Sequence, residues 1–182
     1  RIIVVDAVAD TFINAFLEKA KKITYGDPYN PANDMGTVIS EEAAKNIESR
    51  VNKAVADGAK LLLGNKREGA LYSPTILDRV PTTSELVALE TFGPVAPIIR
   101  AKNIDEALTI AKDTPYALAG AIATKDRALA HRVANELVVG QFSWNGTPSY
   151  RTEAAPFGGF GHSGSGEKEG VVHAAQSMRR IR

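Results

Sequence analysis

The sequence of 182 residues contains no cysteine, and this absence removes several kinds of chemistry at once. Without a thiol the chain can form no disulfide, no cysteine-based metal site and no covalent intermediate on a cysteine of its own. The three histidines show no close spacing of the kind that metal ligands share: His131, His162 and His173. We therefore expect neither a disulfide framework nor a structural metal site.

The chain has almost no net charge, because 22 lysines and arginines stand against 21 acidic residues. It lacks the excess of basic side chains that binding to nucleic acid or to an anionic membrane requires. The sequence also shows no apolar run long enough for a membrane span and no basic-then-apolar leader. We expect a cytoplasmic protein that binds a small molecule and has neither a nucleic acid nor a membrane as its partner.

The first residues, Arg1-Ile2-Ile3-Val4-Val5, have the pattern of a strand, and no methionine precedes them. Native chains rarely begin inside a strand, so we interpret the sequence as an excerpt from a longer protein. A complete small domain with a trimmed N-terminus is the alternative. The hydrophobic fraction of 44% is enough for one sizeable core in either case.

Helical and strand patterns alternate along the chain. Apolar residues at three- and four-residue steps predict helices at about residues 7–22, 41–56, 103–111, 126–137 and 169–178. Apolar runs predict strands at residues 1–5, 60–64, 71–77, 95–100, 117–124 and 138–144, and the run at 60–64 is expected to be buried. Because Pro74 cannot donate to a ladder, we expect residues 71–77 at a sheet edge. This alternation predicts the α/β class, with a mostly parallel sheet and helices on both faces.

Glycines gather within thirteen residues near the end of the chain: Gly158, Gly159, Gly161, Gly164, Gly166 and Gly170. Glycine permits positive φ and a close approach of one backbone to another, so we expect this loop to follow a tight path beside a site. The letters G-x-G-x-x-G occur at residues 159–164, but this segment does not open a βαβ unit, as a dinucleotide fingerprint must. A glycine-rich turn that packs against the last helix is the alternative.

Two islands of sequence resemble the aldehyde dehydrogenase superfamily: Glu90-Thr91-Phe92-Gly93-Pro94, and Pro156-Phe157-Gly158-Gly159 followed by Ser163-Gly164-Ser165-Gly166. The resemblance covers the whole chain. It implies that residues 1–182 form a single, partial catalytic domain, which begins with Arg1 just after the catalytic cysteine. The cysteine, the general-base glutamate and the Rossmann cofactor domain would then lie upstream, so that the resemblance places no catalytic residue in this chain.

Glu90 stands directly before a turn in which Pro94 fixes φ and Gly93 gives freedom, so its carboxylate is held at a rigid bend. A carboxylate of this kind suits the hydroxyls of a ribose, and a surface glutamate that caps a loop is the alternative. The resemblance implies that Glu90 binds the nicotinamide ribose of NAD or NADP. It also implies that Phe92 packs beside the nicotinamide.

The segment between Asn145 and Pro156 borders the substrate tunnel in the family that the chain resembles. Within it Arg151 carries a planar fork of donors that suits a carboxylate, phosphate or phosphonate, which favours an anionic or polyhydroxylated aldehyde. An ion pair of Arg151 with Glu153 is the alternative. The resemblance implies that Phe157 lines the tunnel beside the reactive centre, whereas Tyr150 is expected either in the tunnel wall or in the core.

The resemblance as a whole implies the C-terminal portion of an NAD(P)-dependent aldehyde dehydrogenase, which oxidises an aldehyde to a carboxylic acid through a cysteine thioester. The arginine at position 151 resembles the lactaldehyde, phosphonoacetaldehyde and non-phosphorylating glyceraldehyde-3-phosphate branches. The isolated chain is expected to be inactive, and the full-length protein to be a homodimer or homotetramer. Two alternatives stay open: a cysteine-free binding or structural subunit of the same fold, and a related reductase of acyl phosphates or acyl-CoA.

Overall fold

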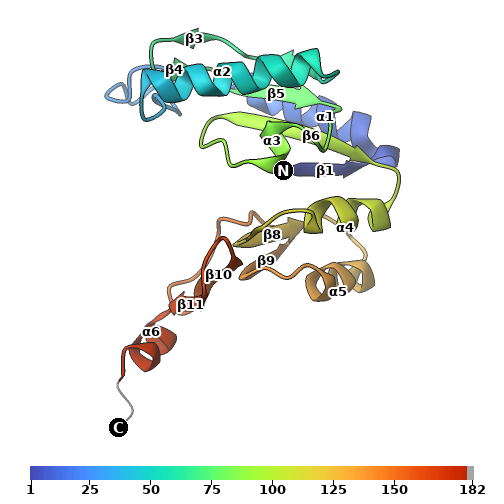
Figure 1. Cartoon of the computed structure of the whole chain (residues 1–182), viewed down its shortest axis with the longest axis vertical. Coiled ribbons are helices and arrows are strands. Elements are labelled where there is room, and N and C mark those ends of the chain that lie inside the picture. Colours follow the sequence, from blue (N-terminus) through green and yellow to red (C-terminus); the bar gives the residue numbers. More distant parts are fainter. Residues whose placement is uncertain (180–182) are drawn as a thin grey trace. The chain divides into compact units, whose positions relative to one another are not determined.

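The computed structural model describes residues 1–179, and its chain divides into two compact units, Arg1–Ile110 and Ala111–Arg182. Figure 1 labels the helices and strands of both units. The boundary between the units falls within α4 (Ile104–Lys112). The expectation that residues 1–182 form one partial catalytic domain stays a prediction.

The first unit is built around a four-stranded sheet whose order is β1-β6-β5-β2. The strands β1 (Ile2–Val5), β6 (Val95–Ala101) and β5 (Thr75–Asp78) run parallel to one another. The strand β2 (Lys60–Leu63) is antiparallel to its neighbour β5. The mostly parallel sheet that the sequence predicts is confirmed.

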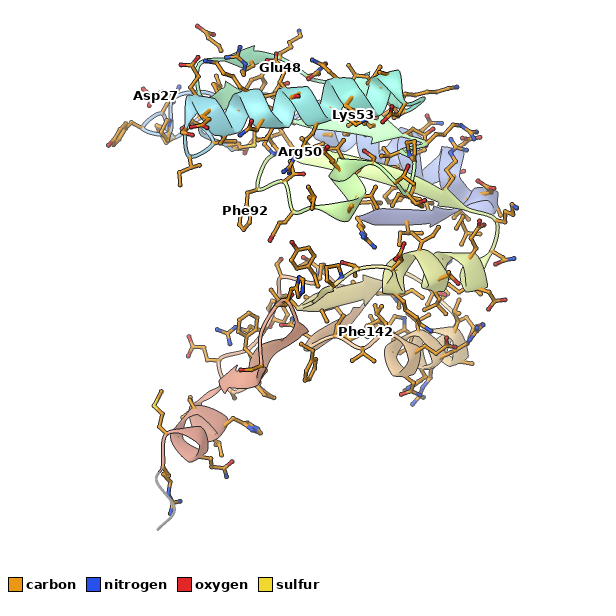
Figure 2. The ribbon with its side chains drawn as sticks, in the orientation of Figure 1. Asp27, Glu48, Arg50, Lys53, Phe92 and Phe142 are labelled. Carbon is orange, nitrogen blue, oxygen red and sulfur yellow. The ribbon has the colours of Figure 1, made fainter. Side chains whose placement is uncertain are left out.

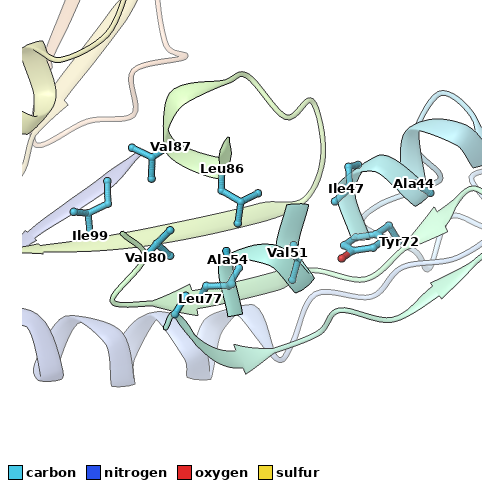
Figure 3. Packing of buried hydrophobic residues seen from close by; sticks show 11 residues of the cluster. Ala44, Ile47, Val51, Ala54, Tyr72, Leu77, Val80, Leu86, Val87 and Ile99 are labelled. Atoms are coloured by element: carbon cyan, nitrogen blue, oxygen red, sulfur yellow. The ribbon is translucent and has the colours of Figure 1, made fainter. Parts of the chain in front are cut away.

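Helices cover both faces of this sheet. Side chains alternate between the two faces along each strand, so neighbouring residues of one strand pack against different helices. In β5, Ile76 packs in a cluster with α1 (Asp6–Ala20), whereas the next residue, Leu77, packs in a second cluster with α2 (Glu41–Ala56). Figure 3 shows side chains of the second cluster, which fills the space between α2 and the sheet. The predicted arrangement of helices on both faces is therefore confirmed as well.

The helix α2 begins and ends where the sequence predicts. The Oγ of Ser40 accepts a hydrogen bond from the N–H of Ala43 at 3.1 Å, which satisfies one of the unpaired donors of the first turn. Gly58 follows the end of the helix with a φ of 107°, a conformation that glycine adopts without steric cost. The buried residues of α2 fall on one face of the helix: Ala44, Ile47, Val51 and Ala54. This face fixes how the helix is turned over the sheet.

Two strands differ from the prediction in their place in the sheet. Residues 60–64 are expected to be buried, yet β2 is an edge strand and its first two residues are exposed. Residues 71–77 are expected at an edge, yet they divide into β4 (Leu71–Tyr72) and the interior strand β5, which is buried throughout. The reason is that Pro74 falls between these two strands, so the ladder of β5 does not require its missing N–H. The strand β4 pairs instead with β3 (Arg67–Glu68).

An ion pair ties β5, β6 and α1 together. The guanidinium of Arg100 donates to both carboxylate oxygens of Asp78, at 3.0 and 2.8 Å, and to Asp10 at 2.7 Å. Burial alone would raise the pKa of Asp78, but the hydrogen bonds from Arg100 and from the N–H of Arg79 hold that pKa below its usual value. Asp78 is therefore ionised at neutral pH although its side chain is almost completely buried.

The second unit contains a β-α-β crossover. The strands β8 (Ala119–Ile122) and β9 (Gln141–Trp144) pair in parallel, and α5 (Arg127–Glu136) joins them. Asp126 caps this helix, because its carboxylate accepts hydrogen bonds from the N–H groups of Ala128 and Leu129. The alternation of strands and helices in this part of the sequence is confirmed.

The glycine-rich segment forms strands, so the prediction of a loop here was wrong. The strand β10 (Phe157–Gly161) pairs antiparallel with β11 (Gly166–Glu169) and with β7 (Tyr116–Ala117). The last helix, α6 (Val171–Ser177), begins later than predicted because residues 166–169 belong to the ladder. A hairpin of this kind depends on pairing between segments, which the local sequence pattern does not reveal.

Candidate functional site

Glu90 and Phe92 lie in a short connection between two packed elements of the first unit. The helix α3 (Glu85–Ala88) is a single turn capped by Ser84, and the sequence did not reveal it because four residues carry little periodicity. Residues 89–94 then run without regular structure until β6 begins. Both predicted cofactor-binding side chains therefore leave the chain between a helix and a strand that are fixed in the unit.

Contacts with α2 hold residues 89–94 in place. Arg50 donates from Nη1 to the carbonyl oxygen of Glu90 at 3.0 Å. Gly93 lies so close to Ile47 that a Cβ at this position would overlap the isoleucine side chain. The backbone can pass this close to Ile47 only where the residue has no Cβ, which explains why the turn carries a glycine.

Phe92 has two features that distinguish it from a packing residue. Its side chain is 82% exposed, and its φ of +46° lies in the left-handed region. This conformation costs a residue with a side chain about 1–3 kcal/mol, and such strain is concentrated at functional sites. Figure 2 shows the ring pointing away from α2. Glu90 is exposed as well, so a carboxylate and an aromatic ring are both available to a ligand.

The second unit brings two of the three predicted substrate-binding residues into contact. The guanidinium carbon of Arg151 lies 4.3 Å from the centroid of the Phe157 ring, which is the geometry of a cation–π interaction. Tyr150 precedes Arg151, and it is 68% exposed, so it does not lie in the core that the described residues form. The carbonyl oxygen of Tyr150 accepts a hydrogen bond from the Nε2 of Gln141 in β9.

Asn145 anchors the start of the segment that carries Tyr150 and Arg151. It follows β9 with a φ of 55°, which asparagine tolerates better than most residues. Its Oδ1 accepts a hydrogen bond from the N–H of Thr124 at 2.8 Å, and its Nδ2 donates to the carbonyl oxygen of Thr124 at 2.9 Å. The Nε1 of Trp144 donates to the same oxygen at 2.9 Å. These bonds fix where the segment leaves the end of β9.

Glycines in this unit allow one backbone to lie directly on another. A Cβ on Gly140, the residue before β9, would overlap the carbonyl oxygen of Gly158 in β10. The expectation of a close backbone approach is confirmed for this pair, although it occurs between strands. The G-x-G-x-x-G letters at residues 159–164 fall in β10 and the turn after it, which is not the strand-to-helix turn of a dinucleotide fingerprint.

Other polar groups of the chain have structural roles. Burial raises the pKa of Tyr72 to about 12, and its phenol donates a hydrogen bond to the Oδ1 of Asn65 at 2.5 Å. Among the side chains that the structure describes, no three or more histidine, aspartate or glutamate residues lie together so that they could hold a metal ion. The described part of the chain also contains no helix that is long and apolar enough to cross a membrane.

The family model for aldehyde dehydrogenases matches residues 1–182. The chain belongs to the aldehyde dehydrogenase family. Within this family member, Glu90 and Phe92 lie in the first unit, whereas Tyr150, Arg151 and Phe157 lie in the second. The roles of these five residues stay a prediction from motifs and from the resemblance, and sequence reasoning missed the arginine of α2 that holds the carbonyl of Glu90.

Curated aldehyde dehydrogenases are similar to the chain over nearly all of its residues. The lactaldehyde dehydrogenase of Methanocaldococcus jannaschii is 42% identical over 181 residues, which are 100% of this chain and 38% of that protein. The sulfoacetaldehyde dehydrogenase of Neptuniibacter caesariensis is 37% identical over 171 residues, which are 94% of this chain and 37% of that protein. The chain therefore spans less than two fifths of the length of these relatives.

Solved aldehyde dehydrogenases share the fold. A glyceraldehyde-3-phosphate dehydrogenase from Methanocaldococcus jannaschii, complexed with NADP, has a TM-score of 0.91 and 41% identity, over 99% of this chain and 39% of that one. The betaine aldehyde dehydrogenase of Staphylococcus aureus, in complex with NAD+, has a TM-score of 0.85 and 36% identity, over 95% of this chain and 36% of that one. The α/β fold is thus part of the aldehyde dehydrogenase fold, as the sequence predicts.

Proposed function

We propose that the chain is part of an NAD(P)-dependent aldehyde dehydrogenase that oxidises an anionic or hydroxylated aldehyde to a carboxylic acid. Family membership supports the class of reaction, and solved relatives are complexes with NADP or NAD+. Two curated relatives are named for lactaldehyde and sulfoacetaldehyde, one hydroxylated and one anionic. We also propose that the full-length protein is a homodimer or homotetramer. A monomer in light scattering would contradict this.

Glu90 and Phe92 are the groups of this chain that fit a nicotinamide cofactor. An exposed carboxylate can accept hydrogen bonds from both hydroxyls of a ribose, and an exposed ring offers a flat surface to the nicotinamide. The connection that carries them is fixed by α2, so that little order has to be created when the cofactor binds. When bound, NAD or NADP accepts the hydride that leaves the substrate.

Arg151 is the residue on which we base the proposal that the substrate is an anionic aldehyde. Its guanidinium lies over the ring of Phe157, which restricts its orientation, and the edge of the guanidinium carries the N–H donors. A carboxylate, sulfonate or phosphate group can accept two parallel hydrogen bonds from such an edge. Tyr150 presents an exposed phenol that can donate to a substrate hydroxyl. We assign these three residues to binding and orientation, and the nucleophilic cysteine to the part of the protein outside this chain.

Arg151→Leu in the full-length protein tests the substrate class. We expect kcat/KM to fall about 100-fold for an anionic aldehyde such as succinic semialdehyde and less than about threefold for propanal, because hydrogen bonds to charged groups contribute about 1.5–3 kcal/mol. Formation of NAD(P)H measures both reactions. Arg127→Leu, in the first turn of α5, is the matched control and is expected to change neither reaction.

Equal losses for the two aldehydes would assign Arg151 to the structure of the protein and not to substrate recognition. Reduction of an acyl phosphate without oxidation of any aldehyde would favour the reductase alternative. A full-length protein with neither activity would favour a binding or structural subunit. The chain of 182 residues by itself is expected to form no NAD(P)H from aldehydes, because it contains no cysteine.

A further inference from the structure

One helix holds the connection at residues 89–94 at two points. Arg50 donates from Nη1 to the carbonyl oxygen of Glu90 at 3.0 Å. One turn earlier on α2, Ile47 fills the space beside Gly93. Figure 2 shows Arg50 between α2 and the connection. Glu90 and Gly93 therefore contact neighbouring turns of α2, and the buried face of this helix is packed in the core.

Arg50 joins three parts of the first unit. Besides the carbonyl of Glu90, its Nη1 lies 3.5 Å from the Oγ1 of Thr91, and its Nε lies 3.6 Å from a carboxylate oxygen of Glu85 in α3. The arginine side chain is 26% exposed, so these interactions are partly shielded from water. A guanidinium can serve several partners at once because its donors form a rigid fork, whereas a lysine offers a single ammonium group.

The strained backbone of Phe92 gives these contacts their importance. A residue keeps an unfavourable φ only where the surrounding structure over-determines it. The contacts from Arg50 and Ile47 lie on the two sides of Phe92 in the sequence, at Glu90 and at Gly93. Without the contact at Glu90, the strain of Phe92 favours relaxation of the connection, and the exposed ring and carboxylate then lose their defined places.

We propose that Arg50 is a positioning residue, which together with Ile47 holds Glu90 and Phe92 in their binding conformation before the cofactor arrives. The inference rests on the proposed function in that it takes a nicotinamide cofactor as the ligand. A connection that is already ordered binds the cofactor with its full affinity. In a relaxed connection only a fraction of the molecules is competent, and the apparent dissociation constant equals the intrinsic one divided by that fraction. Loss of Arg50 therefore raises KM for the cofactor and leaves kcat at saturation unchanged.

Arg50→Leu in the full-length protein is the test. We expect KM for NAD(P) to rise about tenfold while kcat changes less than about twofold. Without cofactor, we expect faster amide hydrogen exchange in peptides that cover residues 89–94. Arg50→Lys is expected to recover part of the affinity, because an ammonium group can still donate to one partner. Lys53→Ala is the matched control, since Lys53 lies one turn further along α2 and pairs with Asp57 at 3.0 Å.

An unchanged KM together with unchanged exchange in Arg50→Leu overturns the inference. A lower kcat and a lower Tm with an unchanged KM also overturn it, because they indicate a structural role only. If Arg50→Leu does not fold, the same two readouts in Arg50→Lys decide. Glu90→Gln separates the two proposals. An unchanged KM for the cofactor in this variant removes the proposed role of Glu90. Faster amide exchange at residues 89–94 in Arg50→Leu still supports the positioning by α2 in that case.

Discussion

The two units hold their proposed binding residues in different ways. The first unit has two hydrophobic clusters, with 11 and six buried residues, and its connection at residues 89–94 rests on a helix that packs in one of them. In the described part of the second unit, the buried hydrophobic residues are Ala130 and Val133, and Arg151 and Phe157 lie on segments that are held by hydrogen bonds and glycine contacts. The comparison shows that packing positions one set of residues and backbone contacts position the other.

The single tryptophan of the chain makes this comparison measurable. Trp144 lies in β9 of the second unit, and the residue is 43% exposed. Its fluorescence follows the second unit alone, whereas circular dichroism follows the helices and strands of both units. Unfolding in urea with both probes can therefore assign a loss of stability to one unit.

The largest effect is expected when the buried ion pair of the first unit is broken. Asp78→Asn is expected to lower the free energy of unfolding at neutral pH by about 3–5 kcal/mol, because it leaves Arg100 without its buried partner. Asp10→Asn removes a carboxylate whose side chain is 82% exposed and is expected to cost less than about 1 kcal/mol. Circular dichroism during urea unfolding measures both variants, and similar losses would contradict the importance of burial here.

The same pair predicts a pH dependence. The pKa of Asp78 is lowered in the folded state, so the pair stabilises the fold above the unfolded pKa of about 3.9, and this stabilisation is lost as the pH falls through the lower folded pKa. Between about pH 4 and pH 2 the unmodified chain should therefore lose stability more steeply than Asp78→Asn. Parallel curves would show that Asp78 does not contribute to the acid sensitivity of the first unit.

A cavity in the core of the first unit is expected to have the next largest effect. Leu77 is fully buried beside α2, and Leu77→Ala is expected to cost about 3 kcal/mol through lost burial and a cavity. Leu118→Ala is the matched change in the second unit, where Leu118 is 40% exposed, and is expected to cost less than about 1 kcal/mol. Equal costs in urea unfolding would remove the contrast between a packed unit and a loosely packed one.

A smaller effect is expected from crowding the glycine contact of the second unit. Gly140→Ala is expected to cost about 2 kcal/mol, because its Cβ would overlap the backbone of Gly158 and the strands must separate. In Gly146→Ala the new Cβ meets only Ser143, at 3.8 Å, and a change within about 0.5 kcal/mol is expected. The fluorescence of Trp144 measures both, and an unchanged midpoint in Gly140→Ala would mean that this contact does not hold the unit together.

Local patterns were enough to predict α1, α2 and α4 and the cap of α2, but not the single turn of α3. The apolar periodicity of α2 extends over four turns, and Ser40 supplies the capping oxygen where the sequence places it. The places of the strands were not predictable in the same way, because the order of a sheet depends on pairing between distant segments. Residues 71–77 illustrate this limit: one proline suggested an edge, yet it lies outside the strand that enters the interior.

The proposed binding residues could be found through motifs, but the structure that holds them could not. Glu90 and Phe92 stand in a recognisable segment, whereas Arg50 lies 40 residues away from Glu90 in a helix whose pattern predicts only packing. The left-handed φ of Phe92 also carries no local signal, because phenylalanine is not a residue that favours this region. Contacts between distant segments determine both features.

The place of β6 in the sheet has a consequence for synthesis of the chain. This strand lies between β1 and β5, and it pairs Ile2 with Ile98. At about 5–20 residues per second, roughly 5–20 seconds separate the appearance of these two residues at the ribosome. During that time β1 is an apolar strand without its neighbour, exposed to chaperones and to other chains. The sheet therefore cannot grow strand by strand from β1: β2 and β5 are neighbours and precede β6 in the chain, whereas the pairing of β1 has to wait for residues 95–101.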